Sequence, residues 1–175
     1  MTFERTISEF PKGALAAAVR AAQSGDRAAF ARLYEQYGRM IHGILLAHVR
    51  YQDAEDLLQT VFLTALERLP SLRDSEAVGG WLATIARNAA IDYHRRQRPA
   101  GPLLEVAAPA TNALMSAEAV MKEIRELPEA YRETLVLRLA EGMTGPEIAE
   151  RTGLTPDSVR VNLSRGMKLL RERLS

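Results

Sequence analysis

Apolar residues recur at intervals of three and four along most of the chain, whereas the strict alternation that is typical of strands is absent. Four stretches interrupt this pattern, at 24–26, 51–53, 70–75 and 98–112. Glycine, proline, serine and aspartate, which favour turns, recur in these stretches. The sequence therefore predicts an all-α fold in which short turns separate the helices.

The last of these interruptions differs from the others in length and composition. Residues 98–112 contain three prolines, one glycine and mostly small side chains. Such a composition cannot form a packed element and is typical of a linker. We therefore expect two small helical domains, at 1–98 and 117–175, joined by a flexible linker at 99–116.

The C-terminal domain has the pattern of a helix-turn-helix. Thr144 and Glu147 have the spacing of a capping box, and the turn Thr152-Gly153-Leu154 follows that helix. Thr155 is a cap-type residue, and Pro156 then occupies the first position of the second helix. The core side of this second helix is an apolar stripe made of Val159, Leu163, Met167, Leu170 and Leu174.

The opposite side of the second helix carries hydroxyl groups and cations. Residues 155–175 contain five lysines and arginines against two acids. A duplex groove is read by such a face, with hydrogen-bonding side chains near the helix start and cations along its length. A surface hairpin with a solvated basic face is the alternative interpretation. The outward residues are Ser158, Arg160, Ser164, Arg165, Lys168 and Arg171.

A helix in the N-terminal domain combines an apolar face with an outward acidic side. Its apolar positions are Leu57, Leu58, Val61, Phe62, Ala65, Leu66 and Leu69. We expect Asp53 to cap this helix, and Asp56, Gln59, Leu63 and Glu67 to point outward. An outward leucine beside acids indicates a partner surface, although single exposed apolar residues are also common without one.

The next helix, from about 77 to 96, also has two distinct faces. Its core side is expected to hold Trp81, Leu82, Ile85, Ala89 and Tyr93. Its outer side carries Thr84, Arg87, Asn88, Ile91, Asp92 and Arg95, and the helix runs into a basic end. Amides and arginines suit contacts to bases and phosphates, while a basic helix end can also serve only to complement the helix dipole.

Composition narrows the possible functions. The net charge of the 175-residue chain is +1, so any binding of nucleic acid must come from local clusters rather than from bulk charge. The absence of cysteine excludes disulfides, zinc ribbons and thiol catalysis, and fits a reducing cytoplasm. The apolar run at 14–22 is interrupted by Arg20 and is too short to span a bilayer, so we expect a cytoplasmic protein without membrane insertion.

Several motifs occur together in an order typical of one family. They are Asp53 to Gln59, then Gly80 to Asn88 with Ile91-Asp92, then Leu127 to Arg132, followed by the helix-turn-helix. In this order and spacing the chain resembles an extracytoplasmic-function (ECF) sigma factor, one of the small two-domain transcription initiation factors of bacteria. The resemblance covers nearly the whole chain.

The resemblance implies a set of binding residues. The 53–62 helix is similar to the family segment that docks on the polymerase clamp. The resemblance therefore implies that the polymerase is contacted by Asp53, Asp56, Gln59 and Leu63. The residues implied for recognition and melting of the minus-ten promoter element are Arg73, Asp74, Ser75, Trp81, Arg87, Asn88, Asp92, Arg95 and Arg96. Those implied for the minus-thirty-five element are Ser158, Arg160, Val161, Ser164, Arg165 and Lys168.

The chain departs from the family pattern at two places. Thr60 stands where the family usually has an acid, which removes one charge-assisted contact to the polymerase. Val161 and Asn162 stand where a serine and an arginine are common. We expect an altered promoter preference, because an apolar group favours a thymine methyl whereas arginine favours guanine.

The resemblance also implies the mode of action. The chain is expected to bind bacterial core RNA polymerase and promoter DNA, to need no metal or cofactor, and to perform no bond chemistry itself. Control by an anti-sigma factor is expected as well. Minus-ten and minus-thirty-five elements would be read about two helical turns apart.

Two other classes of protein fit parts of the sequence. A stand-alone helix-turn-helix regulator would use the C-terminal domain but leaves the N-terminal motifs unexplained. An enzyme would need a metal held by Asp53, Glu55 and Asp56, for which no histidine stands at a convincing ligand spacing. We expect His42, His48 and His94 to be packing or surface residues.

Overall fold

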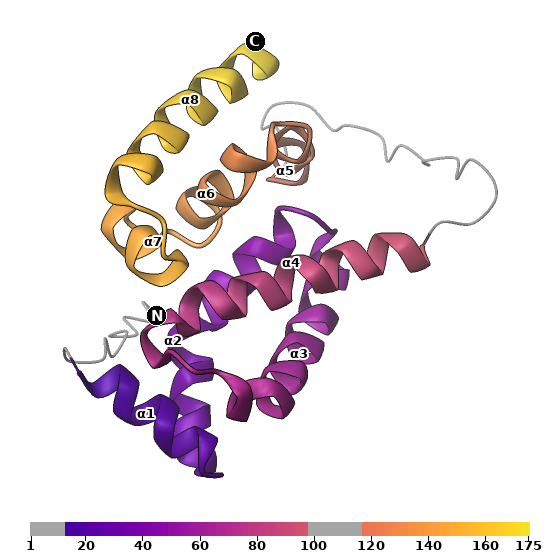
Figure 1. Cartoon of the computed structure of the whole chain (residues 1–175). Coiled ribbons are helices and arrows are strands. Elements are labelled where there is room, and N and C mark those ends of the chain that lie inside the picture. The colour runs from indigo at the N-terminus through magenta and orange to yellow at the C-terminus, as the bar shows by residue number, and fades with distance from the viewer. Residues whose placement is uncertain (1–12, 98–116) are drawn as a thin grey trace, which may run out of the picture.

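The computed structural model describes residues 13–97 and 117–175. Every regular element in these two ranges is a helix, and the helices form two bundles that are stacked one on the other (Figure 1). This confirms the expectation of an all-α chain with two helical units. The linker predicted at 99–116 lies outside the described residues.

The N-terminal bundle contains four α-helices and two short 3₁₀ turns. They are α1 (Ala14–Gln23), α2 (Arg27–Leu46), α3 (Tyr51–Arg68), η1 (Leu69–Ser71), η2 (Ser75–Ala77) and α4 (Val78–Arg96). The C-terminal bundle consists of α5 (Ala117–Arg125), α6 (Glu129–Leu139), α7 (Gly145–Thr152) and α8 (Pro156–Leu174). Among the described helices, none combines the length and the apolar character that crossing a membrane requires.

The α2 helix is the centre of the N-terminal bundle, since α1, α3 and α4 all pack against it. Its start is fixed by Asp26, whose Oδ1 accepts hydrogen bonds from the backbone N–H groups of Ala28 (2.8 Å) and Ala29 (3.1 Å). Its inward side includes large apolar residues without exposed surface, among them Met40, Ile41, Ile44 and Leu45. Burial of these side chains stabilises the bundle through the hydrophobic effect.

Two details of the predicted α3 helix are wrong. The helix begins at Tyr51, two residues before Asp53, so Asp53 lies in the first turn and does not cap it. Leu66, assigned to the apolar face, is 48% exposed. The reason is that, among the described elements, the main neighbours of α3 are α2, α4 and η1, which cover a narrower stripe than the predicted one. The fully covered residues of that stripe are Ala54, Val61, Phe62 and Ala65.

The C-terminal bundle depends on a close crossing of α6 and α8 at Gly166. A Cβ atom at this position would lie 3.0 Å from Cδ1 of Leu135 and 3.1 Å from Cβ of Tyr131. The missing side chain therefore lets the two helices approach, and Leu135 fills the space with no exposed surface. The α5 helix packs against both α6 and α8 and closes the bundle.

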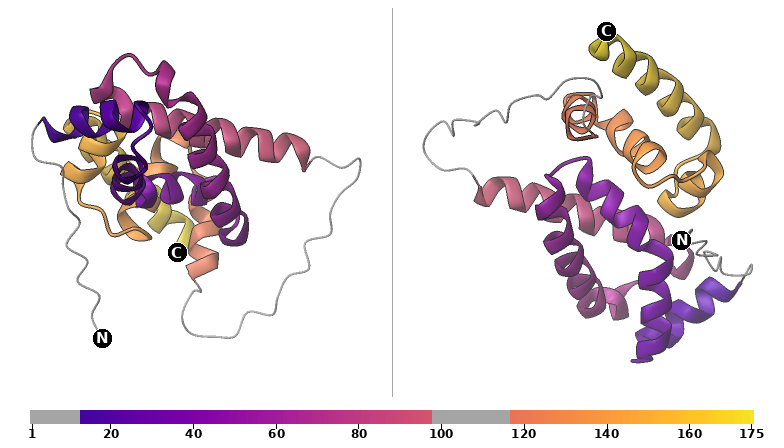
Figure 2. Two further views of the ribbon diagram at one scale, coloured as in Figure 1. Left: turned by 90° about the horizontal axis from the view of Figure 1, so that it is seen from below. Right: turned by 180° about the vertical axis from the view of Figure 1, so that it is seen from behind.

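The two bundles are docked on each other: α2 lies against α6, and α4 lies against α7 (Figure 2). Glycines permit this contact at two points. A Cβ at Gly43 of α2 would lie 2.6 Å from Cδ2 of Leu137, and one at Gly79 of α4 would lie 2.2 Å from the carbonyl oxygen of Arg151. No side chain could be added at Gly79 without separating α4 from α7.

Truncation of Leu135 tests the packing of α6 on α8. Leu135→Ala removes a fully buried side chain, so we expect a loss of about 2–5 kcal/mol in the free energy of unfolding measured with urea. Leu139→Ala on the same helix is the matched control, because Leu139 is 47% exposed and its truncation should cost less than about 0.5 kcal/mol. Equal losses at both positions would contradict this packing.

Candidate polymerase and promoter interfaces

The helix-turn-helix is formed by α7 and α8, and both predicted caps are present. The backbone N–H of Thr144 donates to Oε2 of Glu147 (2.6 Å), and the N–H of Glu147 donates to Oγ1 of Thr144 (3.4 Å). This reciprocal capping box fixes where α7 begins. Gly153 ends α7 with a left-handed φ of 75°, which a residue with a side chain rarely adopts. The capping box and turn predicted from the sequence are therefore confirmed.

The start of α8 is fixed by Thr155. Its Oγ1 accepts from the backbone N–H of Ser158 (3.1 Å) and donates to the hydroxyl of the same residue (2.8 Å). The cap therefore orients the hydroxyl of Ser158. This hydroxyl lies at the N-terminal end of α8, and side chains at that end of a recognition helix contact base edges in the groove.

The outer face of α8 matches the predicted one. Ser158, Arg160, Ser164, Arg165 and Lys168 are exposed, whereas the apolar stripe is turned to the core. Val161 and Asn162 are only half-buried, so both retain accessible atoms on the flank of this face. Arg160 is paired with Asp157 at 3.3 Å, but both side chains are largely in water and this pair holds the arginine weakly.

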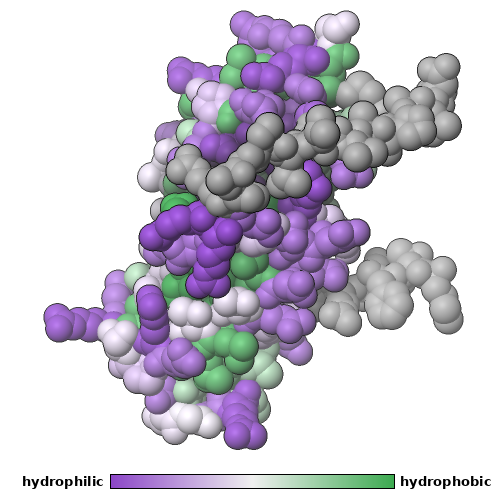
Figure 3. Space-filling view, turned by 90° about the vertical axis from the view of Figure 1, so that its right-hand side faces the viewer, coloured by the Kyte–Doolittle hydropathy of each residue, from purple (hydrophilic) through white to green (hydrophobic). Residues whose placement is uncertain are grey.

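The outer face of α3 also matches the predicted one at most positions. Asp56 and Gln59 are exposed, and Leu63 is 64% exposed. Figure 3 shows apolar side chains reaching the surface of the N-terminal bundle, bordered by hydrophilic ones. The hydroxyl of Thr60 donates to the carbonyl of Asp56 within the same helix (3.2 Å).

Asp53 differs from the other predicted polymerase contacts. It is half-buried and lies near the hydroxyl of Tyr93 on α4. Burial first, and then the nearby Asp53 carboxylate, raise the pKa of Tyr93. The carboxylate of Asp53 is therefore less available to a partner than that of Asp56, which is exposed.

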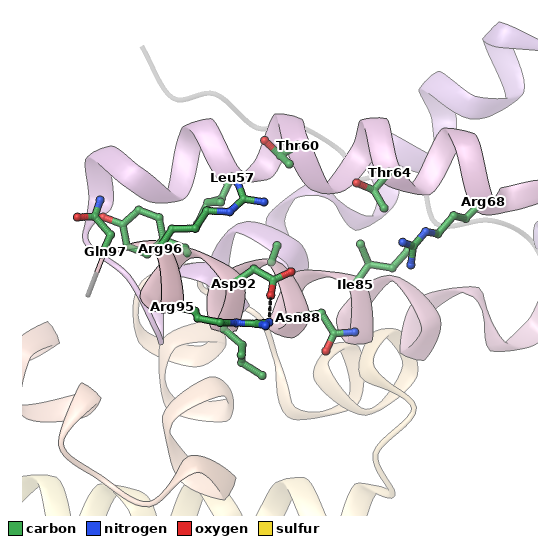
Figure 4. A pocket seen from close by; sticks show the side chains of 13 residues that line it. Leu57, Thr60, Thr64, Arg68, Ile85, Asn88, Asp92, Arg95, Arg96 and Gln97 are labelled. Atoms are coloured by element: carbon green, nitrogen blue, oxygen red, sulfur yellow. Dashed lines mark hydrogen bonds and ion pairs between the residues drawn. The ribbon is translucent and has the colours of Figure 1, made fainter. Parts of the chain in front are cut away.

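A groove of about 760 Å³ lies between α3 and α4 (Figure 4). Four predicted minus-ten residues line it: Asn88, Asp92, Arg95 and Arg96. Arg68 of α3 also lines it, and it reaches in at the end opposite to Arg96. The sequence alone does not indicate Arg68 as a site residue, because a basic residue in the last turn of a helix has the simpler explanation of complementing the helix dipole.

Four further minus-ten residues lie around the η2 turn and the start of α4. Arg73 and Asp74 are exposed, and Oδ1 of Asp74 accepts from the N–H of Glu76 (3.0 Å), which caps η2. Ser75 is half-buried. Trp81 is also half-buried and packs against the hydrophobic core, so its ring serves the packing of α4 in this arrangement.

Arg87 does not lie on the open outer face where the sequence placed it. It is turned to the C-terminal bundle, where its Nε and Nη2 donate to the two carboxylate oxygens of Glu133 on α6, each at 2.8 Å. Glu133 is only 9% exposed. The expectation of a freely exposed Arg87 is therefore wrong for this arrangement, because docking of the bundles supplies a buried partner.

Two histidines take part in the same interface and were not recognised in the sequence. Nε2 of His48 lies 3.1 Å from Oε1 of Glu133, and Nδ1 of His42 lies 2.7 Å from Oε1 of Glu141. Arg39 donates to the backbone carbonyl of Glu141. These partners stand 85 to 102 residues apart in the chain, and no local pattern links them.

The described residues bring together one group of three histidine or acidic side chains close enough to share an ion: His48, Glu129 and Glu133. Both oxygens of Glu133 are already bonded to Arg87. The trio proposed for a metal enzyme, Asp53, Glu55 and Asp56, forms no such group within 13–97 and 117–175.

Comparison with known proteins gives the family. Sigma-70 region 2 matches residues 33–100, and sigma-70 region 4 matches residues 117–170. The chain is 31% identical over 161 residues to the RNA polymerase sigma factor CarQ of Myxococcus xanthus, which covers 87% of this chain and 92% of CarQ. It is 31% identical over 147 residues to the ECF RNA polymerase sigma factor SigM of Mycobacterium tuberculosis, which covers 81% of this chain and 75% of SigM.

A solved structure agrees at the level of the fold. CnrH, in complex with the cytosolic domain of CnrY, matches with a TM-score of 0.61 and 22% identity, over 91% of this chain and 96% of CnrH. Two helical bundles, a helix-turn-helix and these matches define a bacterial transcription initiation factor. The chain belongs to the extracytoplasmic-function group of RNA polymerase sigma factors.

The environment of Glu133 leads to a dependence of stability on pH. Burial by itself would raise the pKa of Glu133, but hydrogen bonds from His48 and Arg87 outweigh burial and hold the pKa below its ordinary value of 4.5. The ionised carboxylate therefore stabilises the folded chain above that value, and this contribution is lost as the pH falls through the lowered pKa.

We expect the free-energy difference between wild type and Glu133→Gln to shrink as the pH falls from about 6 to about 3, measured by urea unfolding. The other carboxylates are present in both proteins, so their titration cancels in the difference between the two free energies of unfolding. Glu35→Gln, which changes an exposed acid on α2, is the control. A difference that stays constant over this range would show that Glu133 is not held ionised by its neighbours.

Proposed function

We propose that this sigma factor binds core RNA polymerase through its N-terminal bundle, reads two promoter elements and stabilises the opened DNA. It carries out no bond chemistry, because the polymerase supplies catalysis. The observation that carries this proposal is the presence of two exposed and chemically different faces on separate bundles: the acidic α3 face and the cationic α8 face. The proposed division of the chain is 1–98, 99–116 and 117–175 for region 2, linker and region 4.

The polymerase contact is assigned to the outer face of α3. Asp56 and Gln59 offer a charge and an amide, and Leu63 beside them offers apolar surface that a partner would bury. Asp53 is the least accessible of the proposed contacts, since it is half-buried and lies near Tyr93 of α4.

The minus-ten contact is assigned to the α4 face, the η2 turn and the groove between α3 and α4. Separated bases must be trapped while cations hold the phosphates. Arg68, Arg95 and Arg96 supply cations around the groove, and Asn88 and Asp92 supply hydrogen-bonding groups. Arg73, Asp74 and Ser75 supply further polar groups from the adjoining turn.

The minus-thirty-five contact is assigned to the outer face of α8. Ser158 and Arg160 lie in its first turns, and Arg165 and Lys168 continue along the same side. Val161 flanks this face and would meet an apolar group such as a thymine methyl.

The site of action and the control of the protein follow from this function. A factor that works with RNA polymerase on the chromosome acts in the cytoplasm. The structural neighbour CnrH is bound to the cytosolic domain of CnrY. We propose that this chain is likewise restrained by an anti-sigma partner.

Reconstitution with core polymerase tests the proposed function. Wild type should start promoter-specific transcripts from genomic fragments with core enzyme and should bind duplex DNA poorly alone. A stand-alone regulator would bind duplex promoter DNA by itself and start no transcript.

The affinity for core polymerase tests the polymerase face. Asp56→Ala combined with Gln59→Ala should weaken binding to core polymerase by about tenfold or more, because both contacts to the clamp are lost. Binding is measured by fluorescence anisotropy of labelled sigma, and circular dichroism checks the fold. Glu35→Ala, an exposed acid on α2, is the control and should bind as wild type does. Unchanged binding of the double variant would remove this face from the assignment.

Salt dependence tests the α8 face. Arg165→Ala should lower the slope of log affinity against log salt by about 1 for holoenzyme on promoter DNA, because one phosphate neutralisation is lost. Arg173→Ala is the control, since Arg173 is on the same helix but its Nη1 lies 3.4 Å from Oε2 of Glu123 on α5. An equal change of slope in both variants would argue against a specific role of Arg165.

A further inference from the structure

We propose that Glu133 competes with promoter DNA for Arg87, so that the docked arrangement of the two bundles is an autoinhibited form of this sigma factor. The inference rests on the proposed function, in which the α4 face reads the minus-ten element. It adds that the bundles must separate before that face is complete.

The competition follows from the geometry of the guanidinium group. Nε and Nη2 of Arg87 donate to the two oxygens of Glu133 at 2.8 Å each, in the parallel two-point arrangement that an arginine also uses for phosphate. His48 approaches the same carboxylate at 3.1 Å from the end of α2. The donor fork of Arg87 is thus occupied by a carboxylate that takes the place of a DNA phosphate.

A second set of polar contacts supports the first. Glu141, just after α6, is bonded to His42 through its carboxylate and to Arg39 through its carbonyl. Nε of Arg125 on α5 donates to the carbonyl of Leu46 at 3.2 Å. Each contact joins the N-terminal bundle to the C-terminal one, so all of them are broken together when the bundles separate.

In the docked arrangement, the α4 and α8 faces also lie too close together to reach both promoter elements. A Cβ at Gly80 of α4 would lie 3.7 Å from the carbonyl oxygen of Thr152, which is three residues before the cap of α8. Chain geometry then keeps Arg165 within about 50 Å of Asn88. Two helical turns of DNA span roughly 70 Å. The docked chain therefore cannot place α4 and α8 on both elements at once.

Glycine-to-alanine variants can separate the bundles without altering charge. Gly79→Ala would set a Cβ 2.2 Å from the backbone oxygen of Arg151, and Gly43→Ala would set one 2.6 Å from Cδ2 of Leu137. Both positions are helical, where alanine is favoured over glycine. Gly38→Ala is the matched control, because the added atom would meet only Tyr34 at an ordinary 3.8 Å.

The experiment measures docking and DNA binding on the same proteins. The chain has no cysteine, so Glu35→Cys on α2 and Glu172→Cys on α8, both exposed, provide a dye pair across the interface. The probe for DNA binding is the single-stranded minus-ten segment of a promoter that the holoenzyme transcribes. Glu133→Gln is tested beside the glycine variants, and Glu150→Gln on α7 controls for the lost charge.

We expect high energy transfer in wild type, Gly38→Ala and Glu150→Gln. Gly79→Ala, Gly43→Ala and Glu133→Gln should lower the transfer and bind the single strand on the order of tenfold more tightly, because the competent form becomes more populated. Arg87→Ala should also lower the transfer but gain no affinity, since it loses both the partner and the DNA contact.

Three results would overturn the inference. They are low energy transfer in wild type, opened glycine variants whose DNA affinity is unchanged, and an Arg87→Ala variant that gains as much affinity as Glu133→Gln. Failure of the proposed function is recognised separately. In that case wild type and opened variants alike start no promoter transcript with core polymerase, whatever the energy transfer shows.

Discussion

Two glutamates enclosed between the bundles set the condition on which the whole arrangement depends. A carboxylate that leaves water is tolerated only if cations or hydrogen-bond donors replace the lost hydration. Glu133 obtains them from Arg87 and His48. Glu141 obtains them from His42 and from Arg39, whose Nε lies 3.9 Å from Oε2, and all four residues belong to the N-terminal bundle. Docking and charge compensation therefore require each other. Neither bundle can bury its share of this surface alone.

Such an interface is specific without being strongly stabilising. When the bundles part, the same charged groups return to water and recover their hydration, which offsets much of the lost attraction. An apolar contact accompanies these polar pairs, because Leu137 of α6 packs against α2 at Gly43 and has no exposed surface. Contacts between domains of one chain are often of this polar, separable kind. A reversible interface is what a protein with two DNA-reading modules requires.

The sequence predicted what local rules determine. The Thr144–Glu147 box, the cap at Thr155 and the outward faces of α3 and α8 depend on spacing within one or two turns, and the structure contains all of them. Pairs such as Arg87 with Glu133 and His42 with Glu141 lie 46 and 99 residues apart and have no periodic signal. The error at Leu66 has the same origin, because neighbouring helices decide which part of α3 is covered.

Docking affects the two proposed DNA-reading faces unequally. The cations of α8 stay exposed in the docked chain, whereas Arg87 on α4 is bonded to Glu133. An encounter with duplex DNA can thus begin at α8 while the α4 face is incomplete. Occupation of the acidic α3 face by polymerase leaves the contacts of Glu133 untouched, since those residues lie on α4, on α6 and in the turn after α2. Binding of polymerase therefore promotes opening only if it favours the separated bundles by more than the docking contacts favour the closed ones.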